Sequence, residues 1–415
     1  MERKEILSKD QCERVLERYT GTRKFDLKSY SINPFQSQLD GFLADQHFLK
    51  IHYQIGDKEQ IVQFFLKILS DSNKVMYEIS RNIYAFEKES FYYETVVPLL
   101  KSKNLDVGYV ARSYFSEPYV VVLEDLSLRN FRMTPKNKPV DLEHCKKCME
   151  TLARFHVAPI LYELEKSKEL GTSYTFLDEY SDVLEDKVFT KEENGATRYV
   201  KSAVQGLFML IDLIPENGSS KSEFKNYLQA ALEEIMSSHE DSMQFRSTLL
   251  HGDLWSNNFL YRYDEGNIID CILIDFQTLN YGPPAMDALH FILINTRKRF
   301  RDKHQEELLK HYYEVFTSLL KQHGFEASEV LTETEFHKSC EAYALPAKVF
   351  AMVDRSITFT MDDYYMETAK SEEEFSRFLF EERGRYMVKD FEENEAFREL
   401  LTEDIVELRD MLFAK

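Results

Sequence analysis

The pattern of apolar and polar residues predicts strands in the first part of the chain. Residues 47–53 and 61–69 are two short runs rich in apolar side chains, and a turn at Gly56 separates them. Residues 108–115 and 119–123 have the pattern of a hairpin. Because the run at 61–69 is nearly continuous in apolar residues, we expect a strand that is buried on both faces.

Helical spacing predominates in the rest of the chain. It marks an amphipathic helix within the first 30 residues and longer helices at residues 82–100 and 142–166. Further helices are predicted from residue 201 onward, and one hairpin interrupts them. Strands first and helices afterwards, with a single hairpin embedded among the helices, predict an α+β fold with two lobes.

The embedded hairpin lies in residues 251–276, which read HGDLWSNNFLYRYDEGNIIDCILIDF. The turn between its strands brings Asn258, at the start of the first strand, close to Asp275, at the end of the second. Their oxygens suit Mg²⁺, which binds few protein ligands together with phosphate oxygens and water. Asp253 lies just upstream, where a phosphoryl-transfer enzyme places the carboxylate that accepts a proton from the attacking hydroxyl. Capping of turns is the alternative role for these residues.

Lys67 interrupts the apolar run at residues 61–69 and therefore needs a charged partner, because a lone buried ammonium is costly. Glu89 falls on the same face of the predicted 82–100 helix as Phe86. A strand lysine paired with a helix glutamate is the arrangement that positions nucleotide phosphates in kinases. In the alternative, Lys67 extends into solvent and Glu89 is hydrated.

The segment LEDL at residues 123–126 predicts the boundary between the two lobes. A strand ends there, and a polar stretch containing proline follows. We expect an N-terminal lobe of residues 1–126 and a C-terminal lobe of residues 127–415 that holds the catalytic loop, the metal site and the acceptor pocket. Adenine would then bind backbone groups near Glu124 and Leu126, unless the segment is an ordinary strand end.

Composition narrows the partners and the compartment. The net charge of −20 disfavours nucleic acid and anionic membranes, since both are polyanions, and no obligate protein partner is implied. Five scattered cysteines fit a reducing compartment, and neither a secretory signal nor a long apolar run is present, so we expect a cytoplasmic protein. Cys145 and Cys148 continue the apolar stripe of a helix, which favours core residues over a metal site.

The string HGDLWSNN followed by IDFQ resembles the catalytic core of the aminoglycoside/choline phosphotransferase superfamily. Within that superfamily the sequence is most similar to the ecdysteroid kinase-like family of arthropods, from about residue 32 to the C-terminus. The resemblance implies a two-lobed protein kinase-like fold. It also implies an enzyme that uses ATP and Mg²⁺ to phosphorylate an alcohol.

The same resemblance supports individual residues. It favours Glu89, in the string FEKESFYYETVVP, over its neighbouring glutamates as the partner of Lys67. It implies that His251 braces the catalytic loop and that Asp287 caps the next helix against that loop. His156, in the string LARFH, would support the loop from behind.

The chain departs from the superfamily in the loop that covers the phosphates. The corresponding string SINPFQSQLDGF has one glycine, Gly41, although close approach of backbone amides to a phosphate normally needs several. Asn33, Ser37 and Gln38 could donate hydrogen bonds instead. This departure concerns the part of the fold on which the affinity for the nucleotide depends.

The predicted acceptor is a small alcohol and not a protein. Trp255 stands where protein kinases carry a lysine, and only eleven residues separate Asp275 from Asp287, too few for a peptide-docking segment. The resemblance implies an ecdysteroid or another hydroxylated steroid or xenobiotic, and Trp255 suits an apolar acceptor. Two alternatives stay open. One is a choline- or aminoglycoside-like kinase whose cationic acceptor binds acidic residues, and the other is a nucleotide-binding protein without catalysis.

Overall fold

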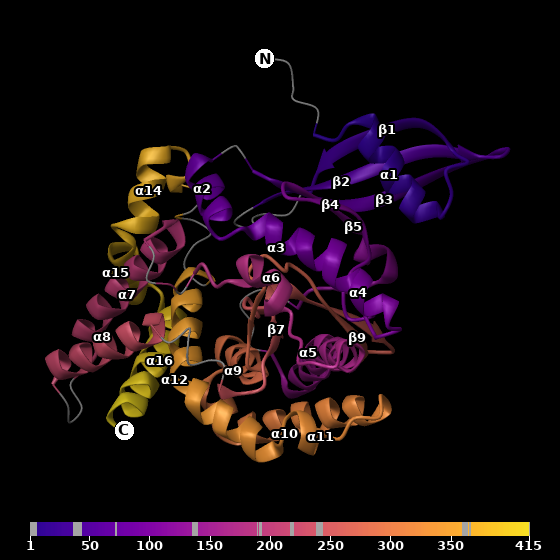
Figure 1. Cartoon of the computed structure of the whole chain (residues 1–415). Coiled ribbons are helices and arrows are strands. Elements are labelled where there is room, and N and C mark those ends of the chain that lie inside the picture. Colours follow the sequence, from indigo (N-terminus) through magenta and orange to yellow (C-terminus); the bar gives the residue numbers. More distant parts are fainter. Residues whose placement is uncertain are drawn as a thin grey trace.

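Of the 415 residues of the chain, the computed structural model describes residues 6–35, 44–70, 73–134, 140–188, 190, 193–215, 220–237, 244–358, 364 and 367–414. Figure 1 shows a sheet at the upper right, built from the first five strands, above a larger body of helices. The predicted α+β architecture with two lobes is therefore confirmed.

The N-terminal lobe is a five-stranded antiparallel sheet in the order β1-β2-β3-β5-β4. Helix α1 (Lys9–Thr20) packs against this sheet through the fully buried side chains of Cys12, Val15 and Leu16, as the amphipathic pattern predicts. The strands are β1 (Asp26–Pro34), β2 (Ala44–Ile55), β3 (Lys58–Leu69), β4 (Ser113–Glu117) and β5 (Val120–Glu124).

Strand β3 carries Lys67 and is the central strand of this sheet. Its residues 64–68 pair with β2 on one side and with β5 on the other. Its first residues pair with β2 alone, and Ile61 is 65% exposed. The expectation of burial on both faces is therefore wrong for most of this strand: its first residues extend beyond β5, and within residues 61–69 only Phe64, Leu66 and Lys67 are buried.

Four helical segments connect β3 to β4, and the second of them carries Glu89. Helix α3 begins at Ala85, three residues later than predicted, and its continuation contains a π-helical turn. Tyr92, in that turn, stacks on Phe276, just beyond the embedded hairpin, with 3.9 Å between the ring centroids. The helix that bears Glu89 is thus fixed against the C-terminal lobe. The segments are α2 (Lys74–Asn82), α3 (Ala85–Phe91), η1 (Tyr92–Val96) and α4 (Val97–Ser102).

The embedded hairpin is present as β8 (Phe259–Asp264) and β9 (Asn267–Leu273), which confirms the predicted turn. Just beyond the paired strands, the amide of Ile274 donates to the carbonyl of Asn258 at 3.1 Å. This bond holds the start of one strand beside the end of the other, so Asn258 and Asp275 belong to the same end of the hairpin.

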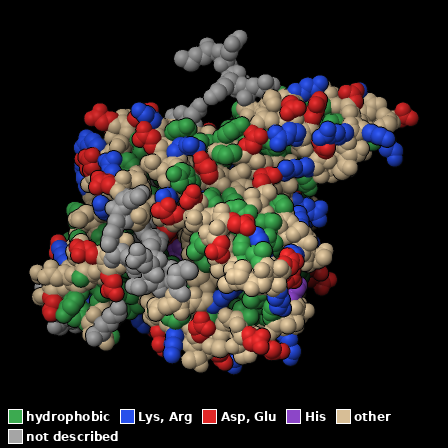
Figure 2. Space-filling model, in the orientation of Figure 1, with side chains coloured by type: hydrophobic (Ala, Val, Ile, Leu, Met, Phe, Trp, Pro, Cys, Tyr) green, Lys and Arg blue, Asp and Glu red, His purple; other side chains and the backbone are tan. Residues whose placement is uncertain are grey.

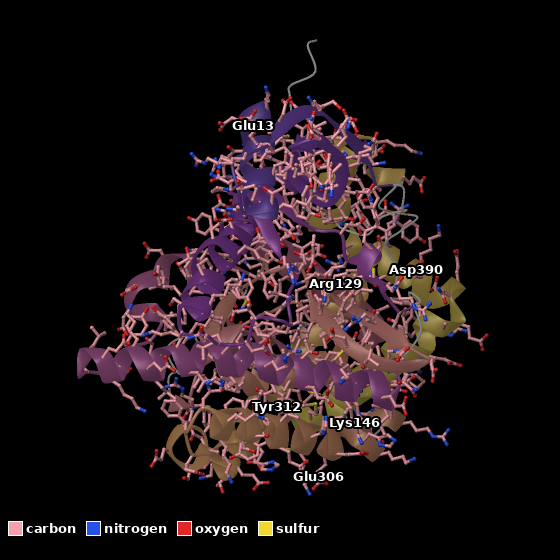
Figure 3. The ribbon with its side chains drawn as sticks, turned by 90° about the vertical axis from the view of Figure 1, so that its right-hand side faces the viewer. Glu13, Arg129, Lys146, Glu306, Tyr312 and Asp390 are labelled. Atoms are coloured by element: carbon pink, nitrogen blue, oxygen red, sulfur yellow. The ribbon has the colours of Figure 1, made fainter. Side chains whose placement is uncertain are left out.

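Helices surround this hairpin. Figure 3 shows the long helix α5 lying across the molecule, below the sheet and above α10, on which Glu306 and Tyr312 are labelled. None of the described helices has the length and hydropathy that a bilayer crossing requires. The other elements of this lobe are η2 (Leu126–Arg129), β6 (Phe131–Arg132), α5 (Leu142–Leu170), α6 (Leu177–Leu184), α7 (Gly195–Leu213), α8 (Lys221–Ser237), β7 (Thr248–Leu250), η4 (Ser256–Asn258), β10 (Asn280–Gly282), α9 (Pro284–Asn295), α10 (Lys298–Gln322), α11 (Ala327–Val330), α12 (Glu333–Thr358), α14 (Glu372–Phe380), α15 (Arg383–Glu393) and α16 (Glu395–Phe413).

Helix α2 links the two lobes on the side opposite the hinge. Its Val75, Met76 and Ile79 share a buried apolar cluster with Phe375 and Phe378 of α14. In Figure 1, α2, α7, α14 and α15 lie together at the left of the molecule. Residues before position 126 therefore pack deep against the C-terminal helices, and the boundary drawn at that position stays a prediction.

Candidate active site

Lys67 and Glu89 form the buried ion pair that their sequence patterns predict. The Nζ of Lys67 lies 2.8 Å from Oε2 of Glu89, and the two residues are 5% and 1% exposed. Burial alone would lower the pKa of Lys67, but Asp275 and Glu89 outweigh it and the pKa is raised. Burial also raises the pKa of Glu89 to about 7, although Lys67 opposes that shift. The alternative in which Lys67 reaches solvent does not apply.

Asp275, from the helical lobe, contacts the same ammonium group of Lys67. Its Oδ1 lies 2.7 Å from Nζ of Lys67, although 208 positions separate the two residues in the chain. The backbone of Asp275 is left-handed, with φ 69°, a conformation that non-glycine residues rarely adopt. Such local strain persists only where the surrounding structure enforces it, and it is common at functional sites.

Asp253 and Asn258 are joined within the catalytic loop. The Nδ2 of Asn258 donates to the carbonyl oxygen of Asp253 at 2.8 Å and to its Oδ2 at 2.9 Å. Burial, followed by the charges of Asp354 and Asp275, raises the pKa of Asp253 to about 7. A carboxylate with that pKa is a stronger base than an ordinary aspartate and suits proton abstraction near neutral pH.

Asn258 and Asp275 offer oxygen ligands that fit a magnesium ion. Because the amide nitrogen of Asn258 is engaged with Asp253, its carbonyl oxygen faces away from those contacts. The side chain of Asp275 is 26% exposed and has a second carboxylate oxygen beyond the one that contacts Lys67. Among the described residues no group of three or more His, Cys, Asp or Glu side chains could hold a metal, so a site here would need phosphate and water ligands as well.

Asp287, at the start of α9, holds the loop that carries Asp253. Its carboxylate accepts hydrogen bonds from the amides of His251 at 2.7 Å and Gly252 at 3.1 Å. Its Oδ2 also lies 3.1 Å from the ring of His156 on α5. Gly252 has φ +79°, and a Cβ there would lie 2.7 Å from a carbonyl oxygen. The loop therefore has a single tightly constrained path.

His251 ties the same loop to the end of the hairpin. Its Nε2 donates to the carbonyl of Ile274 at 2.9 Å, and its Nδ1 accepts from the amide of Asp253 at 3.3 Å. Burial lowers the pKa of His251, which favours the neutral ring that can donate and accept at once. Of the three residues predicted to support the loop, Asp287 contacts it, His251 lies within it, and His156 reaches it through Asp287.

The hinge contains fewer available groups than the sequence pattern suggests. The amide of Glu124 donates to the carbonyl of Arg112 at 2.8 Å, and its side chain accepts from Arg112 and from Arg129. Leu126 opens the short helix η2 directly after it. Figure 3 labels Arg129 where the sheet meets the helices. Any adenine contact at Glu124 must therefore come from its carbonyl oxygen, and that contact stays a prediction.

Most of the predicted phosphate-covering loop, including Ser37, Gln38 and Gly41, lies outside the described residues. Asn33 is described, and its side-chain amide donates a hydrogen bond to the hydroxyl of Ser31 at the exposed end of β1.

The two cysteines of the predicted apolar stripe, Cys145 and Cys148, are fully buried and are therefore core residues, as predicted.

Three residues that interact electrostatically with Asp253, and a fourth that contacts one of them, carry no motif in the sequence. His290 of α9 lies 2.9 Å from Asp354 of α12, and the charge of Asp354 acts on Asp253. Tyr199 of α7 is half-buried, and burial together with the charges of Asp354 and Asp253 raises its pKa. The guanidinium of Arg383, on α15, stacks on the ring of Tyr199. Only the packing of four helices brings these side chains together, so no local spacing reveals them.

The chain is similar to several known proteins. A curated relative, the 4-hydroxytryptamine kinase of Psilocybe cyanescens, is 36% identical over 63 residues, which are 15% of this chain and 16% of that kinase. The chain thus spans about one sixth of that relative's length. The ethanolamine kinase of Plasmodium vivax is 12% identical with a TM-score of 0.40, and the match covers 89% of this chain and 83% of that one.

The GDP complex of wild-type aminoglycoside 2'-phosphotransferase-IIIa is a third similar protein, 13% identical with a TM-score of 0.37 over 96% of this chain and 99% of that one. A sequence model of the ecdysteroid kinase-like family matches residues 38–325, a shorter range than the similarity to the C-terminus that we expected. Because this match covers well over half of the sequence, the chain belongs to the ecdysteroid kinase-like family.

Proposed function

We propose that the protein is a kinase that transfers the γ-phosphoryl group of ATP to a hydroxyl of a neutral, lipophilic acceptor such as an ecdysteroid or another hydroxylated steroid or xenobiotic. The observation that carries this proposal is the contact of 2.7 Å between Lys67 of the sheet lobe and Asp275 of the helical lobe. It sets an ammonium for the nucleotide phosphates directly beside a carboxylate suited to a metal.

The proposed roles follow from the contacts. Lys67, held by Glu89, binds the phosphates of ATP. Asn258 and Asp275 would hold Mg²⁺, which neutralises charge on the transferred group. Asp253 orients the acceptor hydroxyl and accepts its proton as the oxygen attacks phosphorus and the bond to ADP breaks. Few other groups are needed, because this chemistry depends mainly on position and charge.

The charges beside Asp253 favour a neutral acceptor. Asp253 and Asp354 contribute two carboxylates, whereas Arg383 contributes a cation. His290 contributes a second positive charge when it is protonated. Although burial lowers its pKa, contact with Asp354 raises the pKa of His290 above its ordinary value. Besides burial, the charges of Asp354 and Asp275 still raise the pKa of Asp253. Arg383 and His290 offset part of this negative charge and so weaken the attraction for an ammonium group.

A second candidate is a kinase for an amine-bearing alcohol. It is favoured by the matched segment of 4-hydroxytryptamine kinase and by Asp354, whose side chain is 29% exposed. The pairing of Asp354 with His290 weakens this candidate, because that carboxylate already has a partner at 2.9 Å. Figure 2 shows acidic and basic side chains interspersed over much of the visible face.

One assay separates these two candidates from each other and from the third alternative, a nucleotide-binding protein without catalysis. Purified protein with ATP and Mg²⁺ is given ecdysone, choline or kanamycin, and ADP production is measured. We expect ecdysone to stimulate ADP production. Stimulation by choline or kanamycin alone would support the second candidate, and no stimulation by a broad panel of alcohols would support a protein without catalysis.

Replacing Asp275 by asparagine should raise the Mg²⁺ concentration needed for half-maximal activity by roughly tenfold or more, because a neutral amide binds a hard cation more weakly than a carboxylate does. The measurement is the activity at saturating ATP as Mg²⁺ is varied. Asp270→Asn is the matched control, since Asp270 lies on the same hairpin with a side chain of similar exposure, 23%. An unchanged Mg²⁺ requirement in Asp275→Asn would contradict the metal assignment.

A further inference from the structure

Arg383 is a buried guanidinium whose hydrogen bonds are incomplete. The residue is 1% exposed, its Nη2 donates to Oγ of Ser356 at 2.9 Å, and its Cζ lies 4.4 Å from the ring centroid of Tyr199. Within the part of the chain that the structure describes, its Nε and Nη1 make no hydrogen bond of good geometry, and Tyr199 is the neighbouring polar side chain that interacts with the guanidinium. Burying such donors without partners costs free energy, so their retention calls for an explanation.

Other buried arginines of the same lobe are paired. Arg355 contacts Asp404 and also donates to three backbone carbonyls, and Arg301 contacts Glu407. Among the described residues no carboxylate lies within ion-pair distance of Arg383. Stabilisation of the fold accounts for the first two arginines and leaves Arg383 without an equivalent reason.

The position of Arg383 is set by a close contact between helices. Gly206 of α7 and Gly384 of α15 face each other, and a Cβ on either would lie 3.2 Å from the Cα of the other. Gly384 directly follows Arg383, and Tyr199 lies two turns before Gly206 on α7. The glycines thus allow α15 to come close enough for the guanidinium to stack on the tyrosine ring.

This contact lies beside the catalytic loop. Asp287, which holds the loop, is one helical turn before His290, and His290 contacts Asp354 of α12 at 2.9 Å. Two residues further along α12, Ser356 accepts the hydrogen bond from Arg383. The chain of contacts therefore runs from the loop of Asp253 to the guanidinium, and it passes through Asp354, whose side chain is 29% exposed.

We propose that Arg383 binds the acceptor, with Nε and Nη1 donating to a carbonyl or hydroxyl oxygen other than the hydroxyl that is phosphorylated. Tyr199 is half-buried and stacks on the guanidinium, so the acceptor oxygen would pass this side chain to reach Arg383. This inference rests on the proposed function and narrows its substrate class to alcohols with a second oxygen at a distance from the first. Alcohols with a single oxygen and ammonium alcohols would be poor substrates, because they leave the donors unpaired or repel the cation.

The test compares Arg383→Met and Arg383→Lys with the wild-type protein. The acceptors are ecdysone, which has several oxygens, androstanol, a steroid with a single hydroxyl, and choline. We expect Arg383→Met to raise KM for ecdysone by roughly 10- to 100-fold with a smaller change in kcat, as the loss of hydrogen bonds from a charged donor predicts. KM for androstanol should stay within about twofold, and Arg383→Lys should recover part of the loss.

Arg385→Met is the matched control, because Arg385 lies on the same helix with a side chain that is 79% exposed. Melting temperature and affinity for ATP are measured for every variant, and both should be unchanged by Arg383→Lys. Turnover of ecdysone with an unchanged KM in Arg383→Met would overturn the assignment of Arg383 and leave the proposed function intact. An equal rise in KM for both steroids would likewise point to a structural role. Turnover of choline but of neither steroid would overturn both proposals.

Discussion

Replacing Asp253 by alanine is expected to lower kcat by about 10²- to 10⁴-fold, the contribution that a positioned general base makes. The affinity for ATP should change little, because a base acts after binding. The measurements are initial rates at saturating ecdysone and ATP, and titration of the nucleotide by calorimetry. Asp264→Ala, at the exposed tip of the same hairpin, serves as the control. If the variant folds but no longer binds ATP with Mg²⁺, Asp253 is a metal ligand and not the base.

The conservative variant Asp253→Asn has a second expected effect, on stability. The folded protein holds the pKa of this carboxyl near 7, above its ordinary value, so folding disfavours the ionised form. The wild-type protein should therefore lose stability relative to Asp253→Asn as pH rises from about 4 to about 7, and the difference should then stay constant. Denaturant unfolding at pH 4, 6 and 8 measures it. A variant that is less stable than wild type at pH 8 would contradict the environment described for Asp253.

Replacing Lys67 by methionine should abolish most transfer and also destabilise the fold. The ammonium contacts both Glu89 and Asp275, so its removal leaves one carboxylate fully buried and a second one beside it. Removing one partner of a buried ion pair typically costs about 3–5 kcal/mol of unfolding free energy. Denaturant unfolding measures that loss, and ADP production measures the activity. Lys50→Met, on the exposed side of the neighbouring strand β2, is the control.

A double variant separates the two roles of Lys67. In Lys67→Met with Glu89→Leu the buried carboxylate is gone as well, so we expect much of the stability to return. Activity should not return, because the phosphates of ATP still lack their ammonium. Recovery of activity together with stability would show that the pair only supports the fold.

The local parts of this site follow from the sequence alone. Asp253, Asn258 and Asp275 lie within one hairpin, whose turn and apolar alternation fix which strand ends meet. Lys67 is conspicuous because it breaks an apolar run, and Glu89 because it lies on the inward face of a helix. In each case the signal spans only a few residues, so it survives without knowledge of the fold.

The sequence was less informative where backbone pairing or exposure depends on neighbouring elements. It did not show that β3 begins before the part that pairs with β5, where Ile61 is exposed. It also did not show that the carbonyl of Arg112 accepts a hydrogen bond from the amide of Glu124, one of the two residues near which adenine was expected to bind. Both facts depend on the lengths and registers of strands that are distant in the chain.

By itself the sequence determined the two-lobed α+β architecture, the catalytic hairpin and the pairing of a strand lysine with a helix glutamate, because periodicity and short spacings encode them. Only the tertiary structure decided which side chains meet in the region of Asp253 and Tyr199. His290, Asp354, Tyr199 and Arg383 come from four helices, and they meet because glycines let α7 and α15 approach and because α9 packs against α12. Such packing between distant helices leaves no period or spacing in a single sequence.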